Sequence, residues 1–364
     1  MAGTESAAGG GKAGRQARSG EGASAGGGVD SRTMRAIVLD GFGGEERMRL
    51  GEVPRPTPGP GEVLVRVAAT SVNRPDLVQR EGNYAPPPGE SEILGLEIAG
   101  RVEALGDGVD ERRIGDRVFA LVAGGGYAEY AVARDDHCLA VPDALTLREA
   151  ACIAETYLTA WLNVFELAAL ENGESALLHG GGGGVNTAAL QLCRVFAPSS
   201  TLYVTASAGK LERVRELGAD HVFDYRADEF AKEIRSLAEG RGVDVILDHL
   251  GAPYLADNQR ALAVGGRLVA IGIMGGAKAE LNIGLLMVKR QRILGSVLRS
   301  RPPSEKAALI GRFGERVMPR FAGGELRPLV SSVMPLAKAA DAHRAMAAGT
   351  HFGKIVLEVD AAVT

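Results

Sequence analysis

A run of five glycines is the feature of this sequence that most directly indicates chemistry. Gly180–Gly184 follows the apolar segment 176–178 and precedes a helix-like stretch. A buried strand that leads through glycines into a helix can hold the pyrophosphate of a dinucleotide. Glycine lets the backbone approach the phosphates, and the free N–H groups of the first helical turn favour negative charge. Alone, the run is equally compatible with a flexible turn, so the flanking segments decide its meaning.

The segments around this run alternate between strand and helix patterns. The expected strands are 176–178, 202–206, 221–223, 243–248, 267–271 and 292–297, and the expected helices are 188–195, 210–217, 228–238 and 254–263. This alternation with short connections predicts a Rossmann-type doubly wound parallel sheet.

The end of the second strand indicates which dinucleotide is bound. An NAD site usually has Asp or Glu there, about 20 residues after the glycine loop, to bind the ribose hydroxyls. This chain has Ser207 and Lys210 instead. A hydroxyl and a cation suit a 2′-phosphate, so we expect NADPH. The alternative is that Lys210 only begins a helix and is solvated.

Composition limits the other possibilities. The net charge of −4 argues against a broad nucleic-acid surface, and no apolar stretch reaches the length of a membrane span. The three cysteines, at 138, 152 and 193, are widely separated, as expected of reduced thiols in a cytoplasmic protein. Residues 1–33 are rich in Gly, Ala and Ser, so we expect them to be disordered.

The two ends of the chain have a different pattern, with short alternating strands and many turns. The expected strands are 35–39, 62–67, 98–105, 117–121, 329–334 and 354–359, with helices after 303 and at 338–347. We therefore expect a mostly β catalytic domain built from 34–157 and 301–364, into which the cofactor domain, 158–300, is inserted.

Several motifs, in order, resemble those of the zinc-free quinone oxidoreductases of the medium-chain dehydrogenase/reductase superfamily. They are SVNRPDLVQREGNYAPPPG (71–89), ILGLEIAG (93–100), GDRV (115–118), ETYLTAW (155–161) and HFGKIVLE (351–358). The resemblance covers nearly all of the chain after residue 34. It implies that the mostly β domain is GroES-like.

The resemblance also implies that no metal takes part in the reaction. Zinc members have a cysteine and a G-H-E motif, where this chain has Asn73 and Gly95-Leu96-Glu97. Neither Asn73 nor Leu96 is a suitable zinc ligand here. Hydride transfer to a quinone fits, because the aromatic oxyanion that forms is a weak base and needs little acid–base help.

The resemblance implies roles for further residues. Asn73 and Tyr84 would line the substrate cleft, although Asn73 could only cap a helix and Tyr84 could only pack. The expected cofactor residues are Thr159, Gly251 and Ile273 at the nicotinamide, Gly181, Gly184 and Val185 at the pyrophosphate, and Ser207, Lys210 and Tyr225 at the 2′-phosphate.

One residue of the glycine motif departs from the family pattern. Asn186 stands where the family has a third glycine. Its side chain could weaken cofactor binding or hydrogen-bond a phosphate. From the pattern alone, Asn186→Gly is expected to tighten NADPH binding modestly.

Three functions remain open at this stage. The first is NADPH-dependent reduction of a quinone. The second is NADPH-dependent reduction of an enoyl or alkenal double bond, with Tyr84 as a proton donor. The third is a catalytically idle dinucleotide-binding protein, which the departure at Asn186 supports. We also expect a homodimer formed through the apolar segments 268–274 and 292–297.

Overall fold

The structure is a computed structural model, and it describes residues 32–363. The expectation of disorder for residues 1–33 therefore lies almost entirely outside the described residues. In the described range, none of the helices has the length and hydropathy needed to cross a membrane.

The middle of the chain forms a parallel sheet. Within residues 32–363 this sheet has six strands in the order β10-β9-β8-β11-β12-β13. The strands are β8 (Ser175–His179), β9 (Thr201–Ala206), β10 (His221–Asp224), β11 (Val243–Asp248), β12 (Leu262–Ala270) and β13 (Arg292–Gly295). The intervening helices are α4 (Gly184–Phe196), η4 (Ala208–Lys210), α5 (Leu211–Glu216), α6 (Phe230–Leu237), η5 (Ala252–Tyr254), α7 (Leu255–Ala261) and α8 (Ile283–Val288).

Successive side chains of each strand point to opposite faces, and both faces of the sheet are covered. On one face, Leu177 of β8 belongs to the same buried cluster as Phe230 and Ile234 of α6. On the other face, Leu178 packs in the cluster that contains Leu190 of α4. The expected doubly wound arrangement is confirmed.

The two chain ends form a second, mostly antiparallel sheet. Among the described residues it contains seven strands, in the order β14-β15-β3-β4-β5-β7, with β6 paired to β3. The strands are β3 (Glu62–Ser71), β4 (Glu97–Leu105), β5 (Arg117–Leu121), β6 (Tyr130–Arg134), β7 (Cys138–Ala140), β14 (Val330–Pro335) and β15 (Lys354–Glu358), and a separate pair is formed by β1 (Thr33–Leu39) and β2 (Met48–Pro54). The associated helices are η1 (Glu45–Arg47), α1 (Arg74–Arg80), η2 (Asp135–His137), α2 (Leu147–Ala150), α3 (Thr156–Trp161), the π-helix η3 (Leu162–Leu167), α9 (Pro303–Arg316), α10 (Met318–Ala322), η6 (Leu336–Lys338), α11 (Ala339–Ala348) and η7 (Ala361–Val363).

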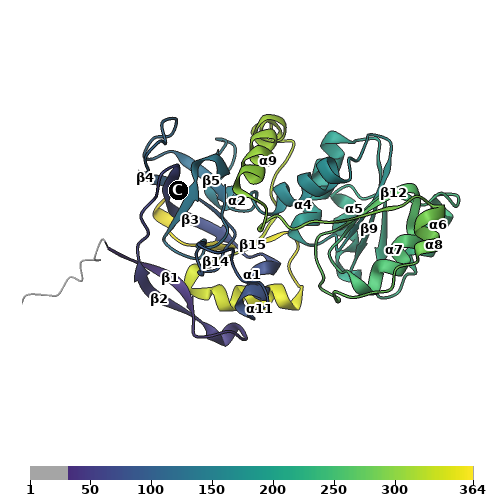
Figure 1. Cartoon of the computed structure of the whole chain (residues 1–364), viewed down its shortest axis with the longest axis horizontal. Helices are drawn as coiled ribbons and strands as arrows, with labels where there is room; N and C mark the ends of the chain where they lie inside the picture. The colour runs from purple at the N-terminus through teal and green to yellow at the C-terminus, as the bar shows by residue number, and fades with distance from the viewer. Residues whose placement is uncertain (1–31, 364) are drawn as a thin grey trace, which may run out of the picture. The chain divides into compact units, whose positions relative to one another are not determined.

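The colours along the chain show that the parallel-sheet segment is inserted between the two segments of the mostly β part. In Figure 1 the purple and yellow segments from the two chain ends lie together in the mostly β part, and the teal and green middle forms the parallel sheet. The Rossmann-type sheet inserted into a mostly β domain is therefore as predicted. The strands of the parallel sheet span 175–295, within the range expected for the cofactor domain, and the boundaries at 157/158 and 300/301 stay a prediction.

Three strands, β2, β6 and β7, were not predicted from the sequence. β2 pairs only with β1, and several of its side chains, including Leu50, are exposed. Only Met48 of this strand is buried, so no apolar alternation indicates the strand. β7 has only three residues, too few for a period to appear.

Candidate functional site

The glycine run forms a tight loop between β8 and α4. Gly180 has a positive φ of 77°, and the N–H groups of Gly180 and Gly181 both donate to the carbonyl of Thr205, at 2.9 Å. A Cβ on Gly181 would lie 2.4 Å from a methyl of Val204, and a Cβ on Gly184 would lie 2.6 Å from Lys354 Cδ. Side chains therefore cannot be accommodated at Gly181 and Gly184 without rearrangement, as expected of a phosphate-binding loop.

The C-terminal HFGK motif (351–354) contacts this loop. The N–H of Gly353 donates to the carbonyl of Gly182, at 3.0 Å, and Gly353 pairs with Gly183 in an isolated bridge. The guanidinium of Arg213 lies over the ring of Phe352, 4.0 Å from its centroid. The segment that leads into β15 is thus attached to the glycine loop.

Ser207, Lys210 and Tyr225 come together at the ends of β9 and β10. The N–H of Lys210 donates to the carbonyl of Ser207, at 2.8 Å, and the N–H of Tyr225 donates to the carbonyl of Ala206, at 3.2 Å. In the described residues Lys210 forms no ion pair, and burial, followed by the charge of Arg213, lowers its pKa. The Lys210 ammonium therefore borders the glycine loop, and Ser207 and Tyr225 follow the adjacent ends of β9 and β10.

Asn186 lies beneath the loop, with 2% of its surface exposed. Its Nδ2 donates to the carbonyl of His179 and, at 3.3 Å, to that of Gly180. Its Oδ1 is buried and has no hydrogen-bond partner among the described residues. The amide thus holds the start of the loop in place, an arrangement that the sequence comparison with the family pattern did not suggest.

Gly251 and Ile273 occupy neighbouring loops after β11 and β12. Gly251 has a φ of 78°, and its N–H lies 3.3 Å from both carboxylate oxygens of Asp248. A Cβ there would lie 2.7 Å from the carbonyl of Gly276, whose N–H donates to the carbonyl of Ile273. The side chain of Ile273 is 63% exposed.

Asn73 is the N-cap residue of α1, and its backbone N–H donates to Asp76 Oδ2, at 2.8 Å. Its side chain joins a buried ion pair: Nδ2 donates to Glu97 Oε1 at 2.9 Å, and Oδ1 accepts from the Lys354 ammonium. Lys354 Nζ lies 3.0 Å from the same Glu97 oxygen. The side-chain amide of Asn73 is therefore largely occupied by protein partners.

Tyr84 and Thr159 stay partly buried. The carbonyl of Tyr84 accepts from Arg299, at 3.2 Å, and the ring centroid lies 5.0 Å from the same guanidinium. Burial, together with the nearby charge of Glu155, raises the pKa of Tyr84 to about 12. Thr159 lies one turn after Glu155, and its N–H donates to the carbonyl of Glu155, at 3.1 Å.

Glu155 is the residue that sequence reasoning missed. Its backbone N–H donates to Glu97 Oε2, at 2.9 Å, and its carboxyl accepts no hydrogen bond from the described residues. In the sequence, Glu155 could have been identified as a single carboxylate directly after the run of small apolar residues 150–154.

The zinc positions of the superfamily do not fit a metal in this chain. Leu96 is buried and has no donor atom, Asn73 is engaged as described, and Glu97 is neutralised by Lys354. Among residues 32–363, no group of three or more His, Cys, Asp or Glu side chains could hold a metal ion. We therefore derive no step through a metal, and the absence of zinc from the purified protein stays a prediction.

The three cysteines are free, buried thiols. Burial raises the pKa of Cys138 to about 12 and also that of Cys193 to about 12. Neither is a reactive thiolate at neutral pH.

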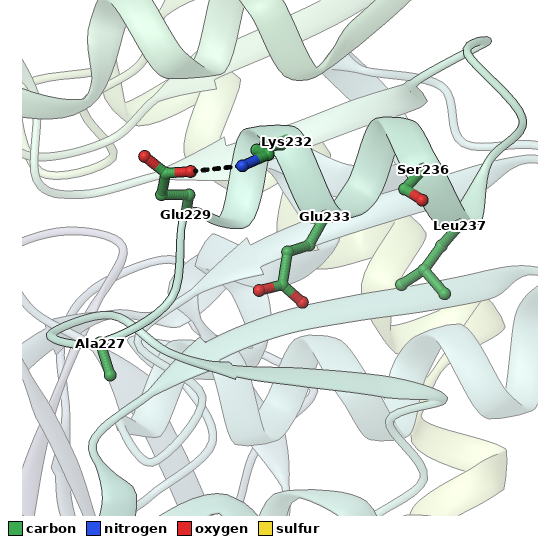
Figure 2. A pocket seen from close by; sticks show the side chains of 6 residues that line it. All are labelled: Ala227, Glu229, Lys232, Glu233, Ser236 and Leu237. Atoms are coloured by element: carbon green, nitrogen blue, oxygen red, sulfur yellow. Dashed lines mark hydrogen bonds and ion pairs between the residues drawn. The ribbon is translucent and has the colours of Figure 1, made fainter.

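A hollow on α6 lies apart from these residues. Figure 2 shows the residues that line it, which include the exposed ion pair between Glu229 and Lys232, at 3.2 Å. None of the predicted site residues is among the residues drawn. The candidate site is therefore defined by the glycine loop and not by this surface hollow.

Two family models match separate ranges of the chain. Residues 59–143 match the alcohol dehydrogenase GroES-like domain, and residues 217–357 match a family described as zinc-binding dehydrogenase.

Whole proteins are similar over most of the chain. The rat synaptic vesicle membrane protein VAT-1 homolog is 33% identical over 89% of this chain and 84% of its own length. The pig quinone oxidoreductase is 36% identical over 86% of this chain and 93% of its own length.

Solved structures agree with these matches. An NAD-dependent alcohol dehydrogenase has a TM-score of 0.79 and 32% identity, covering 90% of this chain and 100% of that one. Mycobacterial Rv1454c, solved with NADPH, has a TM-score of 0.81 and 29% identity, covering 90% and 100%. The CurK enoyl reductase has a TM-score of 0.80 and 28% identity, covering 90% and 99%. With this fold and this identity over the length of its relatives, the chain belongs to the medium-chain dehydrogenase/reductase superfamily of oxidoreductases.

Proposed function

We propose that this protein is an NADPH-dependent, metal-free quinone reductase. The observation that carries the proposal is the group of Ser207, Lys210 and Tyr225 beside the glycine loop. A Cβ on Gly182 would lie 3.2 Å from the Lys210 ammonium, so this cation lies against the phosphate-binding backbone. Both NAD and NADPH occur among similar structures, so the choice rests on these side chains.

The residues around the loop fit a dinucleotide phosphate. The N–H groups at the start of α4 would hold the pyrophosphate, and Ser207, Lys210 and Tyr225 would hold the 2′-phosphate. Gly251 and Ile273 would line the nicotinamide, as would Thr159. NADPH, when bound, supplies the hydride; the chain binds it, orients it and excludes water.

Reduction of a quinone is supported by the named relatives at about this level of identity, such as the pig quinone oxidoreductase. In this proposal Tyr84 and Asn73 border the acceptor. Because Asn73 is held by Lys354 and Glu97, it would position the acceptor mainly through the remaining lone pair on Oδ1.

Reduction of an activated carbon–carbon double bond is the second candidate. The similarity to the CurK enoyl reductase favours it, since that structure shares the fold over nearly its whole length. The two candidates differ in the acceptor and share the hydride donor.

Turnover of NADPH with an ortho-quinone and with an enone distinguishes these candidates. Faster oxidation with the quinone supports the first candidate, and faster oxidation with the enone supports the second. Absence of NADPH binding would instead favour a catalytically idle protein.

A further inference from the structure

We infer that Glu155 donates the proton that accompanies hydride transfer, an inference that rests on the proposed reductase function. It concerns a residue at the start of α3, between the predicted acceptor residue Tyr84 and the predicted nicotinamide residue Thr159.

The burial pattern of α3 identifies where Glu155 points. From Ala150 to Val164, all residues are buried except Glu155 and Thr159. Residues four positions apart in a helix lie on the same face. Both side chains are therefore partly exposed on the same face of an otherwise buried segment. The nicotinamide is expected on this face, because Thr159 is a predicted nicotinamide residue.

Tyr84 faces the same region from the loop after α1. Arg299 contacts Tyr84, with its guanidinium 5.0 Å from the ring centroid, and the charge of Glu155 contributes to the raised pKa of Tyr84. Arg299 itself is fixed by bonds to Ala123, at 2.8 Å, and to the carbonyl of Tyr84. The Glu155 side chain thus faces the region of the predicted acceptor position, and within residues 32–363 its carboxyl has no hydrogen-bond partner.

The surroundings keep the Glu155 carboxyl protonated at neutral pH. Burial raises its pKa to about 8, and the nearby carboxylate of Glu97 adds to this effect. The other charged groups around it are Asp76 of α1, Lys354 of β15, Arg299 after β13 and Lys306 of α9. Lys354 and Arg299 oppose the rise but do not cancel it.

The step balances with the proposed co-substrate. The acceptor gains a hydride, and its carbonyl oxygen takes the electron pair released by the conjugated bond. The O–H bond of the Glu155 carboxyl breaks, and an O–H bond forms on that oxygen. The resulting carboxylate recovers a proton from solvent, and the dinucleotide leaves oxidised.

The test compares the full-length wild type with Glu155→Gln, Glu155→Asp and the control Glu90→Gln, which removes an exposed carboxylate from the same region. We expect kcat for quinone reduction in the wild type to fall above pH about 8. Glu155→Gln should abolish that fall and lower kcat by less than the roughly 100-fold typical of losing a general acid, because solvent can also protonate the weakly basic aromatic oxyanion. Glu155→Asp should recover part of the rate together with the pH limb, and Glu90→Gln should match the wild type.

A second measurement does not depend on activity. Infrared difference titration of the cofactor-free protein should show a carboxyl that ionises near pH 8 and is lost in Glu155→Gln. If Glu155→Gln does not fold, this titration and the pH dependence of kcat in the wild type still test the role of Glu155.

The outcomes separate this inference from the proposed function. An active wild type with Glu155→Gln of equal rate, or with a reduced rate but an unchanged pH limb, overturns the role of Glu155 alone. A wild type that binds NADPH and reduces neither acceptor overturns the proposed function, and the role of Glu155 with it.

Discussion

Lys210 and Gly182 are in close contact: a Cβ added to Gly182 would lie 2.5 Å from Lys210 Cδ. A lysine that follows the second strand of the sheet thus reaches back across the loop that follows the first. This contact links the predicted 2′-phosphate residues to the predicted pyrophosphate residues, and a side chain at position 182 would displace the Lys210 side chain.

Lys210→Ala is expected to weaken NADPH binding selectively. The variant loses a charge-assisted contact, which corresponds to about 1.5–3 kcal/mol, and NADH binding should change little. Fluorescence titration with both cofactors measures this difference. Lys232→Ala, which removes an exposed lysine from α6, is the matched control and should behave as the wild type. Equal affinities of the wild type for NADPH and NADH would contradict the prediction.

Asn186→Gly is now expected to weaken NADPH binding, whereas the family pattern alone favoured tighter binding. The substitution removes the hydrogen bonds to His179 and Gly180 that hold the loop. Unfolding free energy should fall by about 1–3 kcal/mol, because two carbonyls lose a donor and glycine adds unfolded-state entropy. Calorimetric titration and denaturant unfolding measure the two effects. Tighter binding at unchanged stability would show that the amide obstructs the phosphates.

Purified protein is expected to contain no stoichiometric zinc. Leu96 supplies no ligand atom, and Lys354 already neutralises Glu97. Elemental analysis tests this directly, and incubation with a chelator should leave activity unchanged. One zinc per chain, or loss of activity on chelation, would disprove it.

A homodimer is expected to form through the β13 edge of the parallel sheet. β13 is the last strand of that sheet among the described residues, and the adjoining α8 exposes Met287 and Val288 by 70% and 80%. An open apolar edge of this kind is a liability in a monomer. Val288→Asp should shift the mass from dimer to monomer in light scattering, and Leu237→Asp, on exposed α6, should not. A wild-type monomer at micromolar concentration would refute the prediction.

The cofactor half of the fold was predictable because its strands are buried on both faces. Segments such as 176–178, 202–204 and 245–247 are continuous apolar runs, as expected of strands in a parallel sheet. Ser207 and Tyr225 were grouped through the family resemblance, and the structure places their backbones together, because the carboxyl ends of neighbouring parallel strands meet at one edge.

Side-chain partners could not be predicted in the same way. The ion pair of Lys354 with Glu97 joins residues far apart in the chain, and no local period indicates that Asn73 lies between them. The orientation of Asn186 likewise depends on the path of the loop above it. Glu155 was missed because a lone carboxylate before a helix has the same pattern as an ordinary helix start.

We expect this chain to pass a hydride from NADPH to a conjugated acceptor. The most direct measurement is a single-turnover experiment that follows NADPH absorbance after mixing stoichiometric protein, NADPH and an ortho-quinone, with NADH and an enone in parallel. We predict rapid loss of NADPH absorbance with the quinone, and slower oxidation with NADH or with the enone. Unchanged NADPH absorbance with both acceptors, or no binding of NADPH at all, would contradict the account.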